Sequence, residues 1–85
     1  MVEVFLEKEE GTIATIRCIP EQDVKRMFYM TIDVKKRKII ENSLGRNTAY
    51  SQHASYRMFE EYKETGKISK HTIAMWYWYK NQEKG

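Results

Sequence analysis

Apolar and polar residues alternate at the start of the chain with the period of two that is typical of strands. This alternation over residues 2–6 predicts a strand with one buried face. A turn is expected at residues 9–11, where glycine follows two glutamates. Residues 12–19 are rich in β-branched side chains, which favour a second strand. Pro20 should end that strand because proline has no N–H to donate. The sequence therefore predicts a first hairpin.

The clearest alternation lies in residues 27–34. One face of this expected strand carries apolar side chains, namely Phe28, Met30, Ile32 and Val34. A charged stretch follows at residues 35–37, and residues 38–44 are predicted to return as a further strand. Two apolar runs on either side of a short polar segment indicate a second hairpin.

A helical period replaces the strand period after Gly45. Apolar residues recur at every fourth position, at Tyr50, Ala54, Met58 and Tyr62. Such a stripe marks an amphipathic helix, which we expect over residues 48–65. Asn47 or Thr48 is suited to cap its first turn, and Gly66 to cap its end.

The C-terminal segment, residues 73–79, is apolar at every position, which leaves strand and helix open. Its aromatic density favours a strand, whereas Ser69 could cap a helix instead. Residues 65–73 also resemble a helix-turn-helix with a glycine turn, in which Lys70, His71 and Ala74 would head a recognition helix.

Together these elements predict one α+β domain over residues 1–85, a chain length that suits a single domain. We expect an antiparallel sheet of four to five strands, made of two hairpins and a C-terminal strand. One amphipathic helix should pack on one face of the sheet. The predicted core is Phe28, Met30, Ile32, Ala54, Met58 and Tyr62.

Cysteine content and hydropathy bear on location. One cysteine cannot form an internal disulfide, and the N-terminus lacks the pattern of a signal peptide. The longest apolar run, residues 73–79, is too short to span a bilayer. We therefore expect a cytoplasmic protein that is not membrane-bound.

The sequence offers little for catalysis. Cys18, His53 and His71 are the only thiol and imidazole groups, and their spacing matches no zinc-ligand pattern. The four glycines are isolated, so no phosphate-binding glycine loop is present. We predict no catalytic residues, no bound metal and no cofactor, and hence that the protein is not an enzyme.

Positive charge is concentrated in the middle of the chain. Residues 1–24 carry two basic and six acidic side chains, whereas residues 25–50 carry seven basic and two acidic ones. Four consecutive cations, Lys35, Lys36, Arg37 and Lys38, form the tip of the second hairpin. Such a tip can neutralise phosphates, although charges on a loop also deter edge-to-edge pairing of strands.

The aromatic run of residues 76–79 holds two tryptophans, Trp76 and Trp78. If this segment is a strand, large rings lie on both of its faces, and one helix can cover only one face of a sheet. We therefore expect Trp76 or Trp78 to contribute to a protein interface or to stack on bases.

These observations predict a small, non-catalytic binding module. The first hypothesis is nucleic-acid binding through the basic hairpin. The alternative is a protein-interaction or regulatory module that uses the C-terminal aromatic segment, with a homodimer as one form of it.

Overall fold

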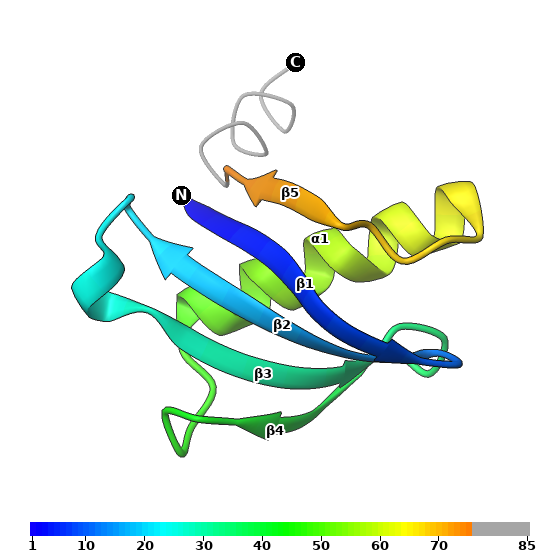
Figure 1. Cartoon of the computed structure of the whole chain (residues 1–85), viewed down its shortest axis with the longest axis horizontal. Coiled ribbons are helices and arrows are strands. Elements are labelled where there is room, and N and C mark those ends of the chain that lie inside the picture. The colour runs from blue at the N-terminus through cyan, green and yellow to red at the C-terminus, as the bar shows by residue number, and fades with distance from the viewer. Residues whose placement is uncertain (76–85) are drawn as a thin grey trace.

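The computed structural model describes residues 1–75, which form an antiparallel five-stranded sheet with one α-helix packed on one of its faces (Figure 1). The strand order is β4-β3-β2-β1-β5. The elements are β1 (Val2–Glu10), β2 (Ile13–Pro20), the short 3₁₀ helix η1 (Val24–Arg26), β3 (Phe28–Asp33), β4 (Lys38–Asn42), α1 (Ala49–Thr65) and β5 (His71–Ala74). The predicted α+β class is confirmed.

The first hairpin pairs β1 with β2, with Val4 opposite Cys18. Strand β1 extends further than the sequence predicts, as far as Glu10, and Gly11 takes a positive φ of 61° in the turn. The register shifts between Leu6 and Lys8. This bulge lets the strand bend without losing its partner.

The second hairpin pairs β3 with β4, and the alternation predicted for β3 is confirmed. Phe28, Met30, Ile32 and Val34 are all buried. Strand β4 ends at Asn42, earlier than predicted, because the Asn42 side-chain oxygen accepts a hydrogen bond from the backbone N–H of Leu44. The chain turns there toward α1.

Helix α1 begins and ends where the capping residues predict. Thr48 accepts a hydrogen bond from the Ser51 N–H, and Gly66 adopts the left-handed conformation at the other end. Ala54 and Met58 are fully buried against the sheet, as predicted. Tyr62 departs from the prediction because it is only partly buried, at the margin of the core.

Strand β5 pairs antiparallel with β1 at the edge of the sheet, with Val4 opposite Thr72. The strand assignment is therefore correct for Ile73 and Ala74, and no recognition helix begins at His71. The Glu61 carboxylate on α1 accepts a hydrogen bond from the Thr72 hydroxyl at 2.7 Å, which ties the strand to the helix. The rest of the aromatic run, residues 76–79, lies outside the described residues.

We expect Met58→Ala to lower the free energy of unfolding by about 2–5 kcal/mol, because it leaves a cavity beneath α1. Denaturant titration measures the change. Gln52→Ala, at an exposed position of the same helix, is the matched control and should change stability by less than about 0.5 kcal/mol. An equally small loss for Met58→Ala would contradict the packing described here.

Candidate functional site

The strand order converts the uneven charge of the sequence into an uneven distribution across the sheet. Residues 25–50, with seven basic and two acidic side chains, include the last two residues of η1 and all of β3 and β4. Strands β3 and β4 are neighbours at one edge, whereas the acidic residues 1–24 form β1 and β2. Cations are therefore most concentrated on the β3–β4 side of the molecule.

The turn between β3 and β4 is built around the carboxylate of Asp33. Its Oδ1 accepts hydrogen bonds from the backbone N–H groups of Lys35 and Lys36 and from the Thr12 hydroxyl, each at 3.1 Å. The Val34 N–H donates to the Thr12 carbonyl at 3.0 Å, so the β1–β2 turn braces the β3–β4 turn. Asp33 itself is 6% exposed.

This environment favours the charged form of Asp33. The Lys36 N–H lowers the pKa of the carboxyl most, and the Thr12 hydroxyl, the Lys35 N–H and the Lys36 charge lower it further. Desolvation opposes these effects but does not outweigh them. The carboxylate thus fixes the turn while remaining ionised at neutral pH.

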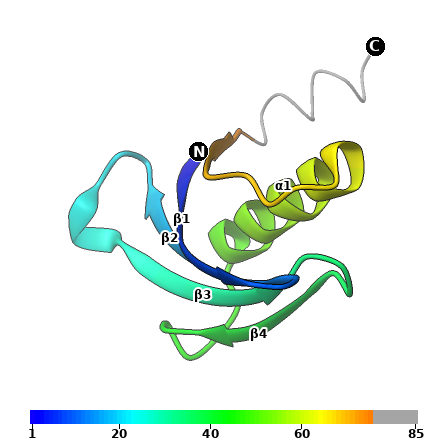
Figure 2. The same cartoon turned by 45° about the vertical axis from the view of Figure 1, so that its right-hand side comes forward.

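Arg37 differs from the other three cations of the turn. Its φ is 58°, a left-handed value that is uncommon outside glycine. Its Nη2 donates to Glu60 Oε2 on α1 at 2.7 Å, and its guanidinium lies 5.6 Å from the Phe59 ring centre. Figure 2 shows the turn rising from the sheet on the side of α1. Arg37 therefore anchors the turn to the helix.

The remaining cations, Lys35, Lys36 and Lys38, are exposed. Within residues 1–75 none of them forms an ion pair, because Asp33 bonds to backbone groups and Glu60 is paired with Arg37. The turn presents three ammonium groups that are free to meet an anion. Of the four predicted site residues, the three lysines are thus available to an anionic ligand, whereas Arg37 holds the turn against α1.

A second cluster lies on the open face of the sheet, the face that α1 does not cover, and its side chains contact one another. Phe5 stacks on His71 of β5 with ring centres 4.7 Å apart, and the Arg17 guanidinium of β2 lies 4.6 Å from the Phe5 ring centre. Glu3 contacts His71 at 2.7 Å, and Glu7 lies 3.2 Å from Arg17. The Phe5 ring, the His71 imidazole and the Arg17 guanidinium therefore each contact other members of this cluster.

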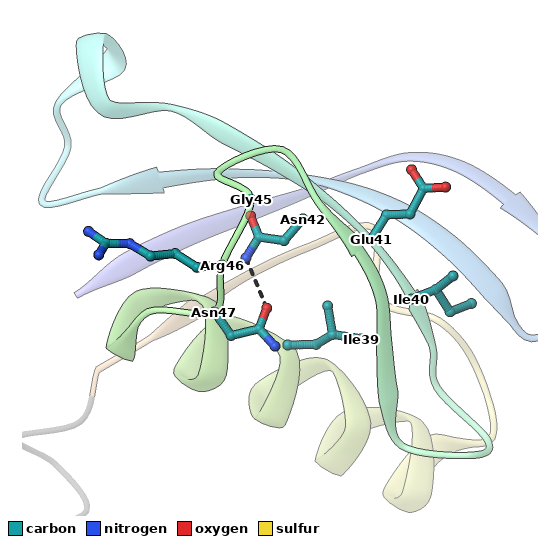
Figure 3. Close-up of a pocket in the computed structure, with 7 residues that line it drawn as sticks. All are labelled: Ile39, Ile40, Glu41, Asn42, Gly45, Arg46 and Asn47. Atoms are coloured by element: carbon teal, nitrogen blue, oxygen red, sulfur yellow. Dashed lines mark hydrogen bonds between the residues drawn. The ribbon is translucent and has the colours of Figure 1, made fainter.

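A hollow of about 230 Å³ lies beside β4 and the loop that leads into α1 (Figure 3). Its polar side chains either bond to one another or point in different directions. Asn42 donates a hydrogen bond to Asn47 at 3.2 Å, and the Arg46 side chain points away from Glu41 in Figure 3. We find no ligand-binding arrangement in this hollow.

The groups considered for catalysis are separated. Cys18 is fully buried on the helix-covered face, and burial raises the pKa of its thiol to about 12. His71 lies on the opposite face, opposite Phe5. In the described part of the chain no three His, Cys, Asp or Glu residues gather as a metal site.

The predicted contacts of Trp76 and Trp78 lie outside the described residues. Over residues 1–75 no helix combines the length and apolar character needed to cross a bilayer. Comparisons of the chain with protein-family models, curated proteins and solved structures find no match.

Asp33 gives the turn a testable pH dependence. A carboxylate whose pKa is lowered by folding stabilises the fold above its unfolded pKa of about 3.9, and this stabilisation is lost as the pH falls through the lower folded pKa. Asp33→Asn should therefore be less stable than wild type at pH 7, and the difference should close below about pH 4. Denaturant titrations across this range measure it. A difference that stays constant with pH would show that the charge of Asp33 does not support the turn.

Proposed function

We propose that the protein binds nucleic acid through the phosphate backbone, using Lys35, Lys36 and Lys38 on the β3–β4 turn. The observation that carries the proposal is a turn held at two points, by Asp33 and by the Arg37–Glu60 pair, with three unpaired ammonium groups outside it. Such an arrangement preorganises positive charge for an anionic partner.

The type of cation indicates the manner of binding. Lysine presents a compact point charge, which suits phosphate oxygens better than the paired acceptors of a base edge. Binding should therefore tolerate changes of sequence and should have micromolar or weaker affinity at physiological salt. Three phosphate contacts correspond to a slope of log K against log salt of about −2 to −3.

A turn whose charges only deter strand pairing would not need these anchors. The edge strand β4 is already short, and its pairing with β3 is irregular beside Ile39, a feature that itself protects an edge. The bonds of Asp33 and Arg37 instead fix the direction in which the lysines project. Two features of the turn therefore support binding: its positive charge, and the bonds that hold its backbone in place.

We expect the triple variant Lys35→Ala/Lys36→Ala/Lys38→Ala to bind a labelled oligonucleotide on the order of tenfold or more weakly than wild type at low salt, because it removes the phosphate contacts. Fluorescence anisotropy at two salt concentrations measures both the affinity and its salt slope, which should shrink in the variant. Arg37 is left in place so that the anchor to Glu60 survives.

The matched control is Lys8→Ala/Lys25→Ala/Arg46→Ala, which removes the same formal charge from β1, η1 and the loop before α1. This variant should bind nearly as well as wild type. Equal losses of affinity in the two variants would show that binding depends on net charge alone and not on the position of the lysines. Absence of binding by wild type at about 100 μM protein would remove the proposal and favour the protein-interaction module instead.

A further inference from the structure

A cavity of about 460 Å³ opens at the same end of the molecule as the β3–β4 turn. It lies between the β1–β2 turn, the end of α1 and the connection to β5. The lining residues are Glu9, Gly11, Tyr62, Gly66, Lys67, Ile68 and Lys70. We refer to it as the Tyr62 groove.

The Tyr62 groove lies next to the base of the β3–β4 turn, residues 34–37, which we call the basic turn. Gly11 of its lining precedes Thr12, which bonds to both Asp33 and Val34 at the base of the turn. Figures 1 and 2 both place the two hairpin turns and the C-terminal end of α1 at one end of the fold.

The lining of the groove combines apolar and cationic groups. Tyr62 and Ile68 are partly buried and pack against the core, which holds their side chains in place. Lys67 and Lys70 are exposed and form no ion pair within residues 1–75. Glu9 is the single carboxylate among the lining residues, and it is exposed. An aromatic ring flanked by free lysines is the arrangement that single-strand-binding proteins use, with bases stacked on rings and phosphates on cations.

We infer that the Tyr62 groove accepts an unpaired base, so that the protein prefers single-stranded nucleic acid to duplex. This inference rests on the proposed function. The strand would place phosphates on Lys35, Lys36 and Lys38 at the turn and on Lys67 and Lys70 at the groove, with a base against Tyr62 between them. A duplex cannot present a base in this way without unpairing it, so it contacts the turn alone.

Single strand and duplex should differ in the number of phosphates they place on lysines, and therefore in the salt dependence of their binding. Five phosphate contacts by a single strand correspond to a salt slope of about −3.5, whereas three contacts by a duplex correspond to about −2.7. Removing Lys67 and Lys70 should reduce the single-strand slope to about −2.1 and leave the duplex slope unchanged.

The test is an anisotropy titration of wild type with a labelled single strand and with the duplex of the same sequence. Tyr62→Leu should weaken single-strand binding about 5- to 150-fold, the range expected from the loss of one stacked base, and should leave duplex binding unchanged. Tyr62→Phe keeps the ring and should bind as wild type does. Because Tyr62 also packs on the core, a denaturant titration of each variant checks that it is folded.

Lys67→Ala/Lys70→Ala provides a second test that does not alter the core. Loss of single-strand affinity and slope in this variant, with duplex binding unchanged, supports the inference. Equal affinity of wild type for single strand and duplex overturns it, as does unchanged single-strand binding by both Tyr62→Leu and the double lysine variant. These results would leave the proposed function intact, whereas absence of binding to either oligonucleotide would overturn the proposed function as well.

Discussion

The arrangement of residues 1–75 follows from one packing constraint, which is that α1 covers one face of the sheet. Ala54 and Met58 of α1 pack with Ile16 and Met30 of the central strands, and this contact determines which side of each strand is buried. It also sets where the helix ends. The last turns of α1 lie above the two hairpin turns, so that Glu60 meets Arg37 and Tyr62 borders the groove.

The basic turn illustrates how like charges can be held together on a small domain. Two unit charges 4 Å apart repel by only about 1 kcal/mol in water, but several of them on a short turn oppose its closure. The carboxylate of Asp33 offsets this by binding two backbone N–H groups inside the turn, and Glu60 offsets it from the helix. The lysines left outside form no ion pair within the described chain, so their ammonium groups can bind an external anion.

The main elements could be predicted from local patterns because each pattern reports on its own residues. The alternation in β3, the four-residue stripe in α1 and the caps at Thr48 and Gly66 all correspond to the structure. The start of β5 was harder to predict, because its buried positions hold Thr72 and Ala74 while Ile73 is 38% exposed. The more polar Thr72 is thus buried while the more hydrophobic Ile73 is exposed, which is the reverse of the usual relation.

The candidate site was only partly accessible to sequence reasoning. An aspartate just before a turn is a known signal for side-chain bonds to backbone N–H groups, so the role of Asp33 could have been found. The Arg37–Glu60 pair joins residues 23 positions apart, and the Phe5–His71 stack joins opposite ends of the described chain. No local pattern encodes such pairs, because they depend on the position of α1 and on the order of the strands.

The central claim is that one end of this fold, formed by the β3–β4 turn and the Tyr62 groove, is a surface for a nucleic-acid strand. Amide chemical-shift mapping during titration with a short single-stranded oligonucleotide tests it most directly. If this end of the fold binds the strand, the largest shifts should fall on residues 35–38 and 66–70, with small shifts for Phe5 and Arg17 on the open face. Shifts concentrated on the open face, or no shifts at a large excess of oligonucleotide, would show that this end of the fold is not the binding surface.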